Sequence, residues 1–308
     1  MKTVSEKKKR ASHNYMREIR KNRDNYLMVA PFAVLFTLFT VIPVILAICM
    51  SFTYFNLLEP PQFRGLFNYV RLFLDDDVFW LSLKNTLIFA LLTGPLSYFV
   101  CLVFAWLINE LPVKMRNLFT LIFYAPSISG ALYIIWGFIF SGDTYGLVNG
   151  LLLKLGFITE PVLWLSDPRF NLGIIIVVQL WLSLGTSFLA FIAGLQGVDR
   201  SLYEAGAIDG IRNRFQEFIK ITIPAIGPSL LFSAVMQISS SFSVGRICMS
   251  LSGFPSTDYS TSTIVTHILD YGTLRYEMGY ACAIATILFL MMFLTNLLVR
   301  RLLRNYTT

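Results

Sequence analysis

The chain has 308 residues, of which 56% are hydrophobic and 14% are charged, and its formal net charge is +7. Soluble domains carry about 25% charged residues, so this composition excludes an ordinary soluble protein and indicates an integral membrane protein. The sequence has no phosphate-binding pattern G-x-x-x-x-G-K-[ST], no H-E-x-x-H, no G-x-S-x-G and no Cys/His cluster. It therefore offers no catalytic residues, no metal ligands and no ATPase site of its own.

Six apolar runs are long enough to cross a bilayer, which takes about 20 apolar residues per helix. In chain order they are 26–50, 83–108, 118–140, 172–195, 221–249 and 278–299. We therefore predict an all-α integral membrane protein with six transmembrane helices. Its first span is interpreted as a true anchor, because its apolar core is longer than that of a cleavable signal. Two shorter apolar patches, 66–74 and 147–158, are expected to pack against the spans or lie at the interface.

The predicted division of the chain follows from these runs. It consists of a basic N-tail (1–25), a first transmembrane helix (26–50), an extracytoplasmic loop (51–82), a five-helix transmembrane core (83–300) that contains a cytoplasmic segment (199–220), and a C-tail (301–308). Most of the 25 Lys and Arg residues fall in the two tails, the 2–3 loop and the 4–5 loop. Cytoplasmic loops collect these residues, so both termini are predicted to be cytoplasmic. The positive net charge then reflects topology rather than nucleic-acid binding.

Ionisable side chains are scarce inside the predicted spans. Arg246 is the one cation placed within a span, near the outer end of the fifth, and we interpret it as snorkelling to the headgroups. The two histidines, His13 and His267, are predicted on opposite sides of the membrane, so no histidine site is expected, and the four cysteines suggest no disulfide framework. Ion-coupled transporters usually carry Asp, Glu, His or Lys near the midplane. A transporter that lacks both these groups and a nucleotide site must be driven by another subunit.

Uncharged polar side chains recur at helical spacing in the fourth and fifth spans. Amides and hydroxyls on facing helices can hydrogen-bond a polyhydroxylated ligand, and Tyr124 or Trp181 would supply a stacking face. The alternative is that these groups only hold membrane helices together. The predicted substrate-pathway residues are Tyr124, Gln179, Ser183, Thr186, Gln237, Ser240 and Ser241.

A polar, small-residue segment, YEAGAIDG at 203–210, lies in the predicted 4–5 loop. We predict a short helix that is capped by Ser201, with Glu204 three residues later as in a capping box, and that ends at Gly210. A second helical stretch is predicted at 213–220. Small residues at 205–207 leave a patch with almost no side chains, which permits close approach of another protein and indicates a docking element.

The same residues carry a family resemblance. Glu204-Ala205-Gly206, three residues, Gly210 and then Ile221-Thr222-Ile223-Pro224 resemble the signature E-A-A-x3-G-x9-I-x-L-P of permease subunits of binding-protein-dependent ABC importers. The stretch is especially similar to the sugar and oligosaccharide branch, the maltose-type permeases. Weaker echoes at the second span (LKNTLIFA) and around the third (APSISGALYIIWGFIF and YGLVNGLL) support the resemblance, which covers about residues 80–300.

The segment departs from this signature at three points. Gly206 replaces an alanine, which weakens a helix by about 1 kcal/mol. Ile223 replaces a leucine, and ten residues rather than nine separate Gly210 from Ile221. An inserted residue rotates the next part of the helix by about 100°, unless a break absorbs it.

The resemblance implies a type I ABC importer permease fold, a bacterial plasma membrane and import of a sugar or oligosaccharide by alternating access. The chain itself would hold no cofactor, because ATP and Mg²⁺ would be bound by a separate ATPase subunit that docks on the short helix. Other implied partners are a second, different permease, an extracytoplasmic sugar-binding protein and membrane lipid. The implied coupling residues are Ser201, Glu204, Ala205, Gly206, Asp209 and Gly210.

Three other functions are weighed against this one. The same fold could import a glycerol-phosphate ester or a peptide, although a phosphate would favour cationic groups along the path. A stand-alone secondary transporter lacks its midplane ionisable groups. An integral-membrane enzyme lacks a catalytic constellation.

Overall fold

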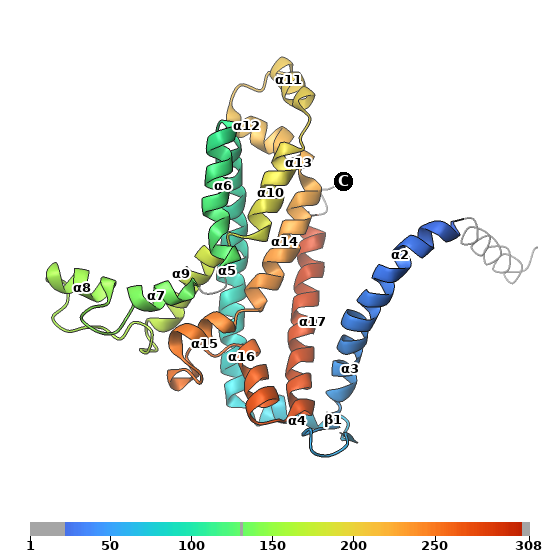
Figure 1. Cartoon of the computed structure of the whole chain (residues 1–308), viewed down its shortest axis with the longest axis vertical. Helices are drawn as coiled ribbons and strands as arrows, with labels where there is room; N and C mark the ends of the chain where they lie inside the picture. Colours follow the sequence, from blue (N-terminus) through green and yellow to red (C-terminus); the bar gives the residue numbers. More distant parts are fainter. Residues whose placement is uncertain (1–21, 130–131, 304–308) are drawn as a thin grey trace, which may run out of the picture.

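The computed structural model describes residues 22–129 and 132–303, so most of the predicted N-tail and C-tail lies outside the described residues. The described residues are mainly helical, with one short antiparallel pair of strands, β1 (Thr53–Tyr54) and β2 (Gln62–Phe63) (Figure 1). In this pair Thr53 lies opposite Phe63. The predicted helical architecture is confirmed.

The longer helices lie in the six apolar runs. They are α2 (Arg23–Phe36) with α3 (Ile42–Met50), α5 (Asp77–Asn109), α6 (Val113–Ile128), α9 (Asn171–Leu182) with α10 (Thr186–Gln196), α14 (Gly227–Phe242) and α17 (Met278–Leu303). The shorter elements are α4 (Phe67–Leu74), α7 (Tyr133–Ile139), α8 (Leu147–Lys154), α11 (Arg200–Ile208), α12 (Arg214–Glu217), α13 (Ile223–Ala225), α15 (Arg246–Ser252), α16 (Ile264–Leu269), the 3-10 turn η3 (Thr257–Tyr259) and the π-helical turns η1 (Thr37–Val41), η2 (Phe218–Thr222) and η4 (Asp270–Leu274).

Four helical segments of the described chain are long and apolar enough to cross a membrane, at 23–50, 77–109, 171–196 and 278–303. Two further spans arise if α6 with α7, and the elbow before α14 with α14, are each counted as one bent span. The described helices therefore provide four to six candidate spans, and the predicted number of six depends on the two bent pairs. The short patches form α4 and α8, which have eight residues each and cannot span.

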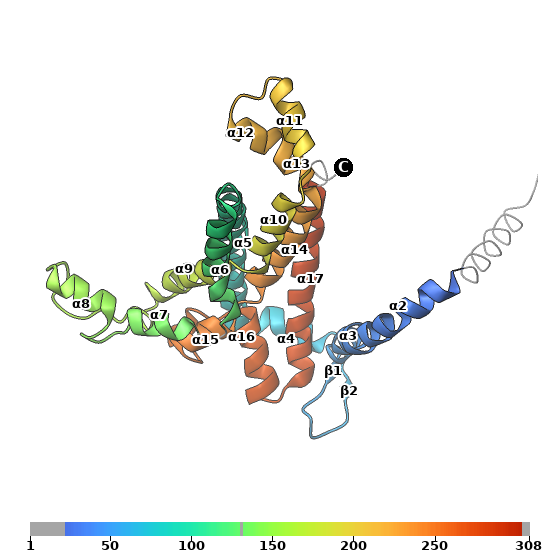
Figure 2. The ribbon, with the colours of Figure 1, turned by 45° about the horizontal axis from the view of Figure 1, so that its top comes forward.

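The first span leaves the rest of the bundle. Its second half, α3, packs against α17, whereas α2 projects away from the other helices in both views (Figures 1 and 2). The π-helical turn η1 lies between the two halves, just before Pro43. Proline lacks an amide proton and its ring crowds the carbonyl four residues earlier, here that of Phe39 within η1. The local widening of the helix relieves this conflict.

The core of the bundle is formed by α5, α10 and α14, which pack pairwise. Their contact surfaces bury one apolar cluster, whose fully buried members include Cys101, Ala105, Phe188 and Phe191. Backbones approach closely where α10 meets α14, because a Cβ at Gly194 would overlap the Ser229 side chain. Small residues at such crossings are the usual means by which membrane helices pack tightly.

Three predicted spans are interrupted, and the third is divided into α6 and α7. The fourth run breaks between α9 and α10, at residues 183–185. The prediction that the fifth run continues as one span to residue 249 is wrong, since α14 ends at Phe242 and a separate helix, α15, begins at Arg246. The turn between them passes so close to Val265 that a Cβ at Gly245 would lie 2.6 Å from its Cγ1. Arg246 is therefore the exposed first residue of a short helix rather than a cation within a span.

We predict that Gly194→Val destabilises the protein by about 1–3 kcal/mol relative to Gly173→Val, because added volume at a packed crossing forces helices apart. Gly173 is the matched control, since it also lies in the helices of the fourth run and a Cβ there meets nothing within 4 Å. Thermal unfolding in detergent, followed by tryptophan fluorescence, measures the difference. Equal losses in both variants would contradict the close packing of α10 on α14.

Candidate functional site

The short helix α11 begins differently from the sequence prediction. Its N-cap is Asp199, whose carboxylate accepts a hydrogen bond from the Ser201 amide at 3.0 Å. This bond lowers the pKa of Asp199. Ser201 lies within the first turn, so the predicted capping box of Ser201 and Glu204 is wrong. Asp and Ser are comparable N-caps, and the carboxylate is further favoured by the positive end of the helix dipole.

The end of α11 agrees with the prediction. Gly210 has φ of +89°, the left-handed conformation that glycine adopts without penalty. The Ile211 amide donates to the Gly206 carbonyl at 3.0 Å, and the Gly210 amide donates to the Ala207 carbonyl at 3.4 Å. These two bonds form a Schellman motif, which satisfies carbonyls that the helix end would otherwise leave free.

The small residues of α11 do not form one exposed patch. Ala205 and Ala207 are exposed, but Gly206 is buried, and a Cβ there would overlap Ile221 Cδ1 and lie 3.1 Å from Ile211 Cδ1. Gly206 thus seats α11 on its own chain, which corrects the docking interpretation for this residue. The exposed surface of α11 is mixed: Ile208 is 86% exposed and Leu202 47% exposed, and the charged Arg200 and Glu204 are exposed beside them.

An elbow joins α11 to the span α14. It consists of α12, the π-helical turn η2 and α13, and this unit meets α14 at 80°. Asn213 caps α12 by accepting from the Gln216 amide at 2.7 Å. The π-helical turn η2 begins within the ten residues that separate Gly210 from Ile221, and a π-helical turn holds one more residue than an α-helical turn.

Three contacts fix the elbow to its neighbours. The Tyr203 hydroxyl lies 3.2 Å from Thr222 Oγ1 and joins α11 to η2. The ring of Phe218 lies on that of Trp106 in α5, with centroids 4.6 Å apart. Together with the seat of Gly206 on the elbow, these contacts connect the exposed helix mechanically to the core.

The predicted pathway residues occupy two kinds of position. Ser183, Gln237 and Ser241 are buried, whereas the remaining four are partly or fully exposed: Tyr124, Gln179, Thr186 and Ser240. Ser183 lies at the break after α9, and its hydroxyl is within hydrogen-bond distance of the Leu180 carbonyl and of Ser97 Oγ in α5. The contact with Ser97 is of the kind that holds membrane helices together.

Gln237 differs from the serines around it. It is 3% exposed, and its Nε2 has no hydrogen-bond partner within residues 22–129 and 132–303. An unpaired buried donor costs about 1–3 kcal/mol, so a partner from outside the described chain is favoured. Ser241, one turn further along α14, donates to the Ile238 carbonyl at 3.0 Å and faces Gly94 of α5.

Sequence reasoning missed a reciprocal serine pair between α10 and α14. Ser187 Oγ donates to the Ser233 carbonyl, and Ser233 Oγ donates to the Ser187 carbonyl, both at 3.2 Å. The second to fifth predicted spans each carry at least one serine, so only the structure identifies the two that meet.

A buried ionic network at the opposite end of the bundle from α11 was also missed. Asp76, the N-cap of α5, accepts from the Phe79 amide at 2.8 Å and from the Tyr280 hydroxyl at 2.7 Å. Its second oxygen also lies 2.9 Å from His267 Nε2. Burial alone would raise the pKa of Asp76, but these hydrogen bonds lower it to about 2. The acidic run at 75–77 was the available signal, yet His267 lies 191 residues away in the sequence.

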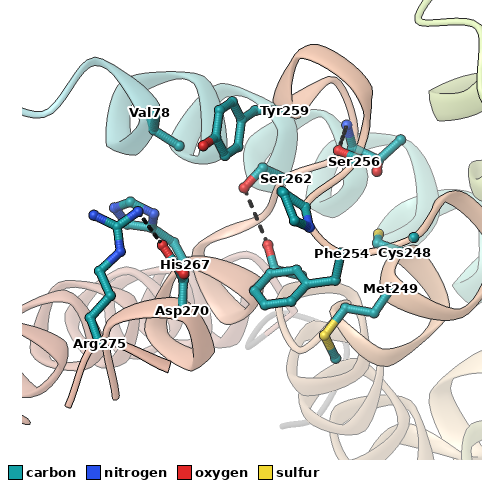
Figure 3. A pocket seen from close by; sticks show the side chains of 14 residues that line it. Val78, Cys248, Met249, Phe254, Ser256, Tyr259, Ser262, His267, Asp270 and Arg275 are labelled. Atoms are coloured by element: carbon teal, nitrogen blue, oxygen red, sulfur yellow. Dashed lines mark hydrogen bonds and ion pairs between the residues drawn. The ribbon is translucent and has the colours of Figure 1, made fainter. Parts of the chain in front are cut away.

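Two adjoining cavities lie beside this network, with volumes of about 140 and 310 Å³. They share His267, Asp270 and Arg275, and the last two form an ion pair at 2.8 Å. Phe254 and Tyr259 line the smaller cavity (Figure 3). Arg71 lines the larger one and pairs with Glu277. Together these side chains form a polar, partly aromatic cleft.

Residues 113–307 match the family described as binding-protein-dependent transport system inner membrane component. The chain belongs to this family. It is similar to the probable ABC transporter permease protein YesP of Bacillus subtilis, with 34% identity over 92% of this chain and 91% of the relative. The family resemblance and the prediction of a transport subunit rather than an enzyme are confirmed.

Two further similarities concern the sugar and oligosaccharide branch of the family and the fold. The lactose transport system permease protein LacF of Rhizobium radiobacter is 31% identical over 87% of this chain and 90% of that protein. A bacterial alginate ABC transporter, solved in complex with an alginate pentasaccharide-bound periplasmic protein, covers 95% of this chain and 98% of its own, with a TM-score of 0.75 and 23% identity. The second likeness confirms the ABC importer permease fold.

We predict that Asp76→Asn lowers stability by about 2 kcal/mol near neutral pH, from a pKa of about 2 in the folded protein against 3.8 for a free carboxyl. Because the folded pKa is depressed, the ionised carboxylate stabilises the fold above pH about 4, and this contribution disappears as the pH falls toward 2. The difference in melting temperature between wild type and variant should therefore shrink from pH 7 to pH 3. The exposed neighbour provides the control Asp75→Asn, and a gap of constant size would contradict the network.

Proposed function

We propose that this chain is a permease subunit of an ABC importer that moves a sugar or oligosaccharide into the cell by alternating access. A separate ATPase subunit binds ATP and Mg²⁺ and docks on α11. The observation that carries the proposal is the exposed helix α11, held on a rigid elbow at one end of the bundle of a chain that belongs to this family. Docking residues are its outward side chains, and Gly206, Asp209 and Gly210 maintain the shape of the helix and its end.

The substrate class rests on the chemistry of the spans and on the relatives. Polar groups along α9, α10 and α14 are amides and hydroxyls, which hydrogen-bond neutral polyols, and Gln237 holds an unpaired donor. The lactose permease is named for a sugar, and the alginate transporter was solved with an oligosaccharide-bound periplasmic protein. A glycerol-phosphate ester would be expected to recruit cations, and the predicted pathway residues include none.

The partners follow from this function. An extracytoplasmic sugar-binding protein delivers the ligand to the end of the bundle that carries Asp76, and a second, different permease completes the pathway. The chain lies in a bacterial plasma membrane with both termini in the cytoplasm, as the distribution of Lys and Arg favours.

The elbow transmits the closing movement of the ATPase subunit to the spans. Gly206 and Tyr203 contact η2, and Phe218 contacts Trp106 of α5. A displacement of α11 is therefore transmitted to α5 and α14 rather than lost in a flexible loop.

We predict that Gly206→Val uncouples the transporter. Its added methyl groups overlap Ile221 and lift α11 from the elbow, so substrate-stimulated ATPase activity and uptake should fall at least tenfold while membrane insertion is kept. Ala207→Val, an exposed position on the same helix, is the control, and Ile221→Ala in the Gly206→Val background should restore part of the activity by making room. Normal stimulated ATPase activity in Gly206→Val would count against the coupling path.

Uptake in proteoliposomes tests the transport function itself. The chain together with its partner permease and ATPase should accumulate labelled oligosaccharide only with ATP inside and binding protein outside. Gln237→Leu should lower uptake about tenfold through loss of one hydrogen bond to the ligand, whereas Ser239→Ala, a neighbour outside the predicted pathway, should not. Transport by the chain alone down an ion gradient would refute the proposal.

A further inference from the structure

A groove of about 280 Å³ runs between α14 and α17, which lie side by side in both views (Figures 1 and 2). One wall is apolar and comes from α14, and the other comes from the last turns of α17. Its lining residues are Leu231, Phe232, Ala234, Val235, Ile238, Asn296, Val299 and Arg300. Phe232 and Val235 are about half exposed, so the described chain leaves the groove open to whatever surrounds the bundle.

The α17 wall adds two polar groups to this apolar surface. Asn296 and Arg300 are four residues apart and therefore lie on one face of the helix. The Asn296 amide nitrogen donates to the Met292 carbonyl at 3.0 Å, but its Oδ1 is buried with no hydrogen-bond partner within the described residues. A donor seated in the groove would supply the missing partner after a small rotation of this side chain.

The position of Arg300 sets the depth of the groove in the membrane. It is an exposed residue in the last turn of α17, three residues before Leu303, and no carboxylate is among the groove's described lining residues. A span of this length places its terminal cations at the level of the headgroups. The groove thus extends from a cation at the membrane surface into the hydrocarbon layer.

We propose that this groove binds an anionic glycerophospholipid of the phosphatidylglycerol class. An acyl chain lies against Leu231, Phe232 and Val235, and the phosphate pairs with the Arg300 guanidinium, whose forked donors match phosphate oxygens. Basic pockets between membrane helices are suited to anionic headgroups. This inference needs only the membrane helices and does not depend on the transported substrate.

The charge preference is tested on the complete transporter, with its partner subunits, purified in mild detergent. Native mass spectrometry measures bound lipid during titration with phosphatidylglycerol and with phosphatidylcholine of the same acyl chains. We expect phosphatidylglycerol to bind at least tenfold more tightly, Arg300→Gln to remove this preference, Arg300→Lys to keep part of it, and Arg301→Gln, the neighbouring exposed arginine, to leave it unchanged. Equal affinity for both lipids, or an unchanged preference in Arg300→Gln, would overturn the proposal.

The place of binding is tested by photocrosslinking. A benzophenone side chain introduced at position 235 in the same complex should crosslink to lipid, and Val235→Trp should lower lipid occupancy by filling the groove. A crosslink from position 235 to a partner permease helix would overturn the proposal, because protein would then cover the groove. Size-exclusion elution and membrane yield equal to wild type establish that the variants fold.

Discussion

Helix α14 packs against α5 and α10 along most of its length, and the elbow, the buried polar groups and the groove beside α17 all take their positions from it. Its cytoplasmic-facing end, by the predicted topology, begins at a bend of 80° that is closed by buried Ile226. Its middle presents Ser233, Gln237 and Ser241 to α10 and α5. One helix therefore links the end of the bundle that carries α11, the proposed docking helix, with the polar groups along α14.

The other end of the bundle combines a buried carboxylate network with an apolar cluster that includes Leu72, Phe79 and Ile264. A buried carboxylate is costly unless its oxygens are hydrogen-bonded, and Asp76 receives donors from three places along the chain. This joins the start of α5 to α16 and α17. The cleft beside it is consequently bounded by helices that cannot separate without exposing or unpairing a charge.

Features encoded locally were predictable from the sequence. The apolar runs predicted the helical membrane fold. Gly210 predicted the end of α11, because a Schellman motif places a left-handed residue there and glycine adopts that conformation without strain. The start of α11 was missed since Asp199 and Ser201 are both good caps and the sequence does not rank them. Gly206 was assigned to an exposed docking patch, whereas it is buried against Ile221. A small residue suits close contact with its own chain and with a partner equally well, so the sequence does not distinguish the two.

Features that depend on distant contacts were not predictable. Asp76 and His267 are separated by 191 residues, and nothing in either segment indicates the other. The turn that follows the end of α14 at Phe242 likewise packs on Val265, a contact that the sequence does not indicate. The elbow shows the same limit: the extra residue was visible in the sequence, but the packing of Phe218 on Trp106, which holds the elbow against α5, was not.

These contacts bear on how movement passes through the molecule. A coupling helix on a flexible loop would absorb displacement, whereas α11 is seated on η2 by Gly206, tied by Tyr203 and backed by the Phe218–Trp106 stack. The bend before α14 is itself packed, because Ile226 is 2% exposed and belongs to the same apolar cluster as Phe188 and Phe191. A displacement of α11 would therefore pass through packed contacts to α5 and α14, and in the alternating-access cycle proposed above this movement would change the position of the polar groups on α14.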